Sequence, residues 1–130
     1  MINKKEILLL DDNSITNFYN EDIIEETKLF DKIYIFENPI GALEWLKIKV
    51  EKKEAVPGCF IVDINMPDMS GFEFLDELES VFENLPSYPR TFILSTSDQE
   101  KDKQKFVKTF MAQEYLVKPL TTAQINKLIK

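Results

Sequence analysis

Histidine is absent from the 130 residues of this chain, and cysteine occurs only once. Without histidine there is no catalytic triad, no histidine general base and no histidine-ligated metal, so any bound metal must be held by oxygen atoms. The single cysteine, Cys59, stands inside an apolar run and has no partner for an internal disulfide, which suggests a reducing compartment. We expect Cys59 to be a small buried hydrophobic residue.

Glycine and long hydrophobic runs are scarce as well. The three glycines, Gly41, Gly58 and Gly71, form neither a Walker loop nor a dinucleotide-binding fingerprint, so no segment is suited to cradle a nucleotide. Near the amino terminus only Ile7–Leu10 is continuously apolar, which is too short for a signal peptide or a membrane span. We therefore expect a cytoplasmic protein with no membrane partner.

Positive charge is outweighed by negative charge. The formal net charge is −7 and the pI is near 4.7, which argues against nucleic acid or an anionic membrane as the main partner. A protein partner or a cation fits such a chain better. The length suits one domain with a sizeable core, which we assign to residues 1–130.

Five short apolar runs have the length of buried strands, and each precedes a segment with helical periodicity. The expected strands are Ile7–Leu10, Lys32–Phe36, Cys59–Val62, Thr91–Leu94 and Glu114–Val117. Five strands alternating with five helices predict an α/β fold with a doubly wound parallel sheet. The fourth helix, after Asp98, is almost wholly charged or amide in its first half.

Apolar spacing predicts which helix faces pack on the sheet. In the first helix, capped by Asn13 or Ser14, the expected buried stripe contains Ile15, Phe18, Tyr19 and Ile23. In the second helix the stripe is Ile40, Leu43, Leu46 and Val50, with Trp45 packing beside it. The polar segment from Glu51 to Gly58 is interpreted as the connection to the third strand.

Charged and hydroxyl side chains follow the expected strands where each one ends. Asp11 and Asp12 follow the first strand, Asp63 the third, Ser95 the fourth and Lys118 the fifth. In a parallel sheet these ends lie on one edge, where open α/β folds bind ligands. Carboxylates held together repel one another unless a cation neutralises them, and oxygen ligands favour Mg²⁺.

A lysine, a hydroxyl and Mg²⁺ beside a carboxylate are what a transferring phosphoryl group needs, because its negative charge spreads over three oxygens. The Asp63 carboxylate is able to attack phosphorus and form an acyl phosphate. With no nucleotide cradle in the sequence, the phosphoryl donor must be a phosphorylated protein or a small phosphodonor.

From Ile7 to Ile129 the chain resembles the response-regulator receiver domains of two-component signalling. The matching motifs are Leu10-Asp11-Asp12, Asp63-Ile64-Asn65-Met66-Pro67 with Gly71, Ser95, and Glu114-Tyr115-Leu116-Val117-Lys118-Pro119. Each motif is weak alone, but their order and spacing are highly specific. The resemblance implies a flavodoxin-like strand order of 2-1-3-4-5.

The resemblance also assigns roles to single residues. It implies that Asp63 is the phosphoacceptor, that Asp12 binds Mg²⁺ directly, that Asp11 helps through water and that Asn65 offers its backbone carbonyl. Lys118 would pair with the acyl phosphate. The resemblance also implies that the Lys118–Pro119 peptide bond is cis, as it is in the family.

In the same family a hydroxyl residue moves toward the phosphate, and an aromatic side chain then rotates inward. These two switch positions correspond to Ser95 and Tyr115.

Three further positions affect rate and output. Thr96 stands where the family usually has alanine or glycine, so its side chain affects the expected phosphorylation rate. Asn65 and Ser97 flank the expected path of hydrolytic water, and we hypothesise that these small polar groups give a phosphate of intermediate lifetime. The partner face would consist of the fourth helix, the strand Glu114–Val117 and the last helix.

The resulting hypothesis is a stand-alone receiver, not an enzyme, which catalyses only its own phosphorylation and dephosphorylation. A sensor histidine kinase or a histidine phosphotransfer protein would phosphorylate Asp63 in the presence of Mg²⁺, and a two-state switch would carry the signal to an unknown protein.

Two alternatives belong to other classes of protein. A haloacid-dehalogenase-type phosphatase also uses a strand-end Asp, a hydroxyl, a lysine and Mg²⁺, but it needs a second Asp where this chain has Asn65. The other alternative is a non-phosphorylated interaction module that keeps the receiver fold. The intact set of Asp11, Asp12, Asp63, Ser95 and Lys118 argues against that alternative.

Overall fold

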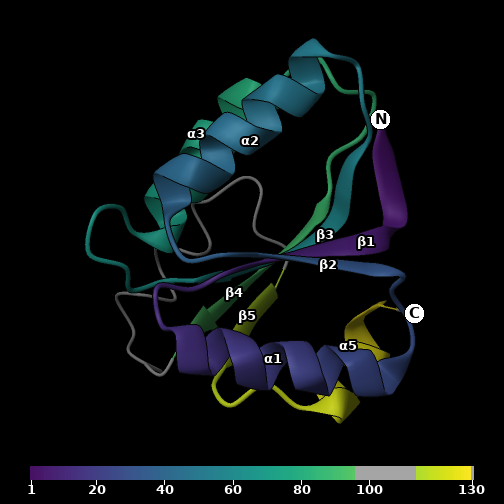
Figure 1. Ribbon diagram of the computed structural model, residues 1–130, viewed down its shortest axis with the longest axis vertical. Helices are drawn as coiled ribbons and strands as arrows, with labels where there is room; N and C mark the ends of the chain where they lie inside the picture. The colour runs from purple at the N-terminus through teal and green to yellow at the C-terminus, as the bar shows by residue number, and fades with distance from the viewer. Residues whose placement is uncertain (96–113, 130) are drawn as a thin grey trace.

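The computed structural model describes residues 1–95 and 114–129, which form a five-stranded parallel sheet with helices on both faces (Figure 1). The strands are β1 (Ile2–Leu10), β2 (Lys32–Phe36), β3 (Val56–Asp63), β4 (Arg90–Ser95) and β5 (Glu114–Val117). The helices are α1 (Ser14–Thr27), α2 (Pro39–Glu51), α3 (Gly71–Val81) and α5 (Thr122–Ile129). The expected fourth helix lies outside the described residues.

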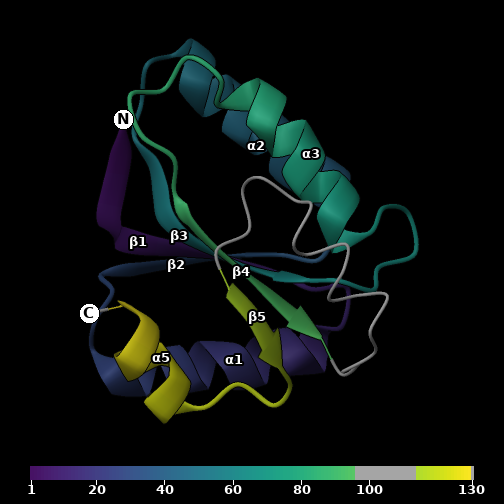
Figure 2. The ribbon, with the colours of Figure 1, turned by 180° about the vertical axis from the view of Figure 1, so that it is seen from behind.

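The strand order is β2-β1-β3-β4-β5, and every pairing is parallel, so the predicted doubly wound topology is confirmed. Helices α2 and α3 cover one face, and α1 and α5 cover the other (Figures 1 and 2). Alternate residues of the central strands enter two separate cores. Leu8, Phe60 and Val62 belong to the core under α2 and α3, whereas Ile7, Cys59 and Ile61 belong to the core under α1 and α5.

Cys59 is buried in the second core, as expected, and burial raises the pKa of its thiol to about 12 against a smaller opposing effect of Arg90. The thiol is therefore protonated at neutral pH and packs as an apolar group. Among the described helices, none is long and apolar enough to cross a membrane.

The first and third strands begin earlier than the sequence predicts. β1 starts at Ile2, where it pairs with Val56, and a register shift separates this pairing from the regular one that begins at Ile7. The predicted connection Glu51–Gly58 is therefore wrong for its last three residues, because Val56, Pro57 and Gly58 belong to β3. The irregular register tolerates Pro57, which has no N–H to donate.

Gly58 is required for the close approach of these two strands, because a Cβ at this position would lie 2.8 Å from the Asn3 carbonyl oxygen.

The predicted buried face of α1 was wrong for three of its four residues and right for Ile23, which is half-buried against the core under α1 and α5. Ile15 and Phe18 are 78% and 73% exposed, and Tyr19 is also exposed, whereas Asn17, Asn20 and Ile24 face the interior. Apolar periodicity favours burial of the apolar side chains, but the helix buries the polar Asn17 and Asn20, and Asn17 bonds the residue that follows β1. In α2 the stripe was right for Leu43, Leu46 and the half-buried Val50, and wrong for the exposed Ile40.

Local capping explains where the helices begin. Asn13 caps α1 by accepting hydrogen bonds from the Ile15 and Thr16 amides, at 2.9 and 3.1 Å. Ser70 and Glu73 form a capping box at the start of α3, and Thr121 and Gln124 bond reciprocally before α5. Each cap lies at the carboxyl edge of the sheet, so the chain enters its helices beside the charged residues.

Candidate functional site

Four strand ends deliver polar residues to one edge of the sheet. Asp11 follows β1, Asp63 ends β3, Ser95 ends β4 and Lys118 follows β5. Because β1, β3, β4 and β5 are consecutive neighbours, these positions lie side by side. The Lys118 amide donates to the Ser95 carbonyl at 2.7 Å, which extends the pairing of β4 and β5 to the lysine.

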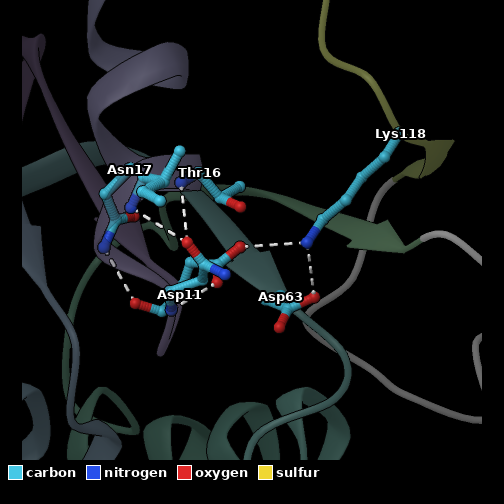
Figure 3. A network of polar contacts seen from close by, with 7 residues as sticks. Asp11, Thr16, Asn17, Asp63 and Lys118 are labelled. Atoms are coloured by element: carbon cyan, nitrogen blue, oxygen red, sulfur yellow. Dashed lines mark hydrogen bonds and ion pairs between the residues drawn. The ribbon is translucent and has the colours of Figure 1, made fainter.

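The site is centred on one lysine and two buried carboxylates. Lys118 Nζ lies 3.1 Å from Asp11 Oδ2 and 3.2 Å from Asp63 Oδ1 (Figure 3). Asp11 and Asp63 are almost fully buried, and the lysine side chain is 19% exposed. Removing charges from water is costly unless they are paired, so this lysine offsets the mutual repulsion of the two acids.

Burial and the charge of Asp11 raise the pKa of Asp63. The pKa of Asp63 is raised to about 6, first because burial disfavours the ionised carboxylate and second because Asp11 repels it. Lys118 and a hydrogen bond from the Asn65 backbone oppose this rise. Burial lowers the pKa of Lys118, but Asp11 and Asp63 outweigh that effect, so its net shift is upward and the lysine is charged at neutral pH.

Three carboxylates form an oxygen-rich cluster that fits a hard divalent cation. Asp11, Asp12 and Asp63 each offer an oxygen within 4.8 Å of the others, and Asp12 is exposed. Mg²⁺ usually binds through one or two carboxylates and keeps several of its waters, so carboxylates at this spacing suit it as ligands either directly or through a bound water. The set contains no nitrogen or sulfur ligand, as magnesium prefers.

The other residues singled out from the sequence surround this cluster. Ser95 is fully buried at the end of β4, and Tyr115 is half-buried against the core under α2 and α3. Asn65 is exposed two residues after the end of β3, and the Lys118–Pro119 peptide bond is cis. Thr96 and Ser97 lie outside the described residues.

Sequence reasoning missed two residues that hold Asp11. The Asn13 amide donates to Asp11 Oδ1 at 2.9 Å, and Asn17 Nδ2 donates to the Asp11 carbonyl at 2.8 Å (Figure 3). Asn13 was predicted only as a cap, and Asn17 was not singled out. A signal for Asn17 was present, because Asn17 and Asn20 are spaced as helix neighbours on one face between apolar residues.

A parallel sheet that presents a buried carboxylate, two further acids and a lysine at its carboxyl edge defines a class of phosphoryl-handling α/β domains. The family model described as response regulator receiver domain matches residues 7–130. The chain therefore belongs to the response regulator receiver domain family and is a receiver domain of two-component signalling. This membership supports the receiver hypothesis over the phosphatase and the non-phosphorylated module.

Individual relatives agree with the family match. A two-component response regulator from Cytophaga hutchinsonii is 29% identical, with a TM-score of 0.85, and the match covers 97% of this chain and 95% of that one. The rice two-component response regulator ORR1 (Oryza sativa subsp. indica) is 24% identical over 95% of this chain and 53% of its own length. The chain thus spans about half the length of the curated relatives it matches.

A third relative extends the likeness in fold. The receiver domain of the Arabidopsis thaliana histidine kinase CKI1, solved with Mg²⁺ and BeF₃⁻, is 18% identical, with a TM-score of 0.76 over 96% of this chain and 85% of that chain.

Proposed function

We propose that Asp63 is the phosphoacceptor of a single receiver domain spanning residues 1–130, phosphorylated by a histidine kinase or a histidine phosphotransfer protein. The observation that carries this proposal is the lysine that joins two buried carboxylates, Lys118 Nζ at 3.1 Å from Asp11 and 3.2 Å from Asp63. Asp63 is the carboxylate that ends a central strand, and the rise of its pKa to about 6 still leaves it mostly ionised at neutral pH.

In the proposed reaction an Asp63 carboxylate oxygen attacks the phosphorus of a phosphohistidine. The new P–O bond gives an acyl phosphate, and the P–N bond breaks as its electron pair returns to the imidazole, which takes a proton from water. Lys118 pairs with the phosphoryl oxygens, and the Ser95 hydroxyl donates to one of them. Burial of the site limits the access of water.

Mg²⁺ would be held by Asp11, Asp12, Asp63 and the backbone carbonyl of Asn65. When bound, it neutralises charge on the phosphoryl oxygens as the P–N bond breaks. The all-oxygen cluster supports this assignment, and the CKI1 receiver domain, of the same fold, was solved with Mg²⁺. The protein acts as a signalling module whose chemistry is confined to its own phosphorylation and dephosphorylation.

The donor is proposed to dock on the exposed apolar side chains of α1. This patch consists of Ile15, Phe18 and Tyr19, and such exposed groups mark a protein-binding surface when they lie together. Ile15 and Tyr19 also line a surface hollow with Lys118 and Pro119, so the patch reaches the edge of the site. A donor seated there would lie beside Lys118, whose ammonium is paired with Asp63.

Output is proposed to leave through the face built by the fourth helix, β5 and α5. Movement of Ser95 toward the phosphate would make room for Tyr115, which lies half-buried on β5. Asn65 and Ser97 would set how fast water removes the phosphate. Replacing Ser97 by a bulky apolar residue should slow dephosphorylation, and an unchanged rate would contradict that assignment.

Intact-mass measurement after incubation with acetyl phosphate and Mg²⁺ tests the central proposal. Wild-type protein should gain one phosphoryl group, and Asp63→Asn should gain none. Asp68→Asn is the matched control, because Asp68 is an exposed acid in the loop after β3 and should not affect the gain. No gain by wild type, or an equal gain by the Asp63 variant, would show that Asp63 is not the acceptor.

A further inference from the structure

Asn17 is a buried polar residue whose hydrogen bonding is only half satisfied. Its side chain is 2% exposed, and its Nδ2 donates to the Asp11 carbonyl at 2.8 Å. Its Oδ1 is buried and has no hydrogen-bond partner among the described residues. A buried unpaired oxygen is unfavourable, and a leucine of similar size would avoid it. An amide at this buried position therefore calls for a role besides packing.

That role is visible in the contacts of Asp11 (Figure 3). Its backbone amide donates to the Phe36 carbonyl at 3.1 Å, which continues the β1–β2 pairing by one residue. Its carboxylate accepts from the Asn13 amide and from Lys118. Its carbonyl lies beyond the last residue of β1 and accepts from the Asn17 side chain. Asn17 therefore fixes the peptide plane between Asp11 and Asp12.

We infer that Asn17 is a positioning residue for the divalent cation: its side-chain amide holds the Asp11–Asp12 peptide so that both carboxylates face Asp63. This inference rests on the proposed function for the identity of the cation. Fixing one peptide plane fixes two ligands at once, because Asp11 and Asp12 are adjacent in the chain. Residues that orient metal ligands in this way typically contribute about tenfold or more to metal affinity.

Asn20 provides a matched comparison within the same helix. It lies one turn after Asn17 on the buried face of α1 and is 3% exposed. In the part of the chain that the structure describes, no hydrogen bond joins Asn20 to the acidic cluster. Replacing Asn20 by leucine thus changes the same chemistry in the same setting without touching Asp11.

Three variants separate positioning from packing. Asn17→Leu removes the donor but fills the space, so its stability should stay near that of wild type. Asn17→Ala removes the donor and leaves a gap, so its stability should fall. Asn20→Leu leaves the Asn17 donor in place. We would measure Mg²⁺ affinity by titration calorimetry, the unfolding midpoint without Mg²⁺, and the hydrogen-exchange rate of the Asn13 amide, which reports on the Asp11 carboxylate.

The inference predicts that both Asn17 variants bind Mg²⁺ about tenfold more weakly, despite their different stabilities, and that the Asn13 amide exchanges faster in both. Asn20→Leu should match wild type in both measurements. The inference is overturned if affinity follows stability across the three variants, or if Asn17→Leu binds Mg²⁺ like wild type.

The exchange measurement needs no metal, so it separates this inference from the proposed function. Faster Asn13 exchange in the Asn17 variants, combined with a wild type that binds no Mg²⁺, would support the positioning of Asp11 and refute the proposed function. Unchanged exchange in both Asn17 variants would refute the positioning role.

Discussion

Gly71 lies directly against the backbone of Asp63. A Cβ added to Gly71 would lie 2.6 Å from the Asp63 carbonyl oxygen and 3.0 Å from the Ile64 Cα, and the Gly71 amide donates to the Ile64 carbonyl at 3.0 Å. The start of α3 thereby holds the segment that carries the candidate phosphoacceptor. The contact is between backbone atoms, so no side-chain rotation relieves the clash that a larger residue would introduce.

Gly71→Ala should therefore destabilise the protein by about 1–3 kcal/mol, because the clash forces the backbone at Asp63 to shift. Gly41→Ala is the matched control. Gly41 lies in α2 with open space around its Cα, so alanine there should stabilise the protein by about 0.5–1 kcal/mol. Urea unfolding followed by circular dichroism measures both changes, and similar effects of the two variants would refute the close contact.

Asp63→Asn should stabilise the protein at neutral pH. Because the pKa of Asp63 rises from 3.8 to about 6 on folding, the folded state keeps a proton that the unfolded chain loses. This contribution to stability is complete below about pH 4, falls as pH rises through 6 and is absent above it. The ionised side chain therefore costs at most about 3 kcal/mol at pH 7.5.

The asparagine variant avoids that cost at neutral pH. Its advantage in unfolding free energy should disappear as the pH is lowered to 4. A stability difference that stays constant from pH 4 to pH 8 would contradict the raised pKa.

Lys118→Met should raise the pKa of Asp63 above about 6, because it removes both the charge and the hydrogen bond that favour the carboxylate. Lys127→Met, an exposed change in α5, should leave the Asp63 titration unaltered. A ¹³C NMR titration of the aspartate carboxyl groups measures both variants. An unchanged Asp63 titration in Lys118→Met would mean that the 3.2 Å ion pair is not formed in solution.

Mg²⁺ should stabilise the wild-type protein against thermal unfolding, since an ion that binds only the folded state at a hundred times its dissociation constant contributes about 2.7 kcal/mol. Asp12→Asn removes one carboxylate of the cluster and should lose most of this effect. Asp68→Asn, which lies outside the cluster, should retain it. Equal stabilisation of all three proteins would indicate nonspecific binding of the ion.

Phe18→Asp should reduce phosphotransfer from a phosphohistidine protein at least about tenfold, as expected for an exposed aromatic anchor of an interface. Phosphorylation by acetyl phosphate should be unchanged, because a small donor does not need α1. Ile48→Asp is the control, since Ile48 is an exposed apolar residue on α2, on the opposite face of the sheet. Slower reaction with both donors would instead indicate damage to the site.

The sequence predicted the site better than it predicted the packing of α1. Strand ends are marked by the change from apolar to polar residues, and parallel topology alone then brings Asp11, Asp63 and Lys118 together. The buried face of α1 was mispredicted because periodicity assumes that apolar residues are buried. The spacing of apolar residues carries no information about the hydrogen bond from the buried Asn17 side chain to the Asp11 carbonyl. Ile15 and Phe18 are apolar and are nevertheless exposed, which the spacing does not predict either.

The first five residues of β1 were missed for a related reason. Residues Ile2–Glu6 are mostly polar, so they lack the apolar run that indicates a buried strand. Ile2 and Asn3 pair with the start of β3 in a register that is offset from the regular pairing at Ile7, and the close approach depends on Gly58 having no side chain. A long-range backbone fit of this kind leaves no periodic pattern in the local sequence.

The position of Trp45 gives this protein a built-in optical probe. Trp45 is the only tryptophan, its ring lies 4.7 Å from the Tyr34 ring and 5.3 Å from the Phe36 ring, and the Lys49 ammonium lies 4.8 Å from it. These contacts belong to α2 and the edge strand β2, which β1 separates from the strand that ends in Asp63. Its fluorescence should therefore follow the melting of this edge and stay nearly constant on the proposed phosphorylation of Asp63, whose proposed effects lie in β4 and β5.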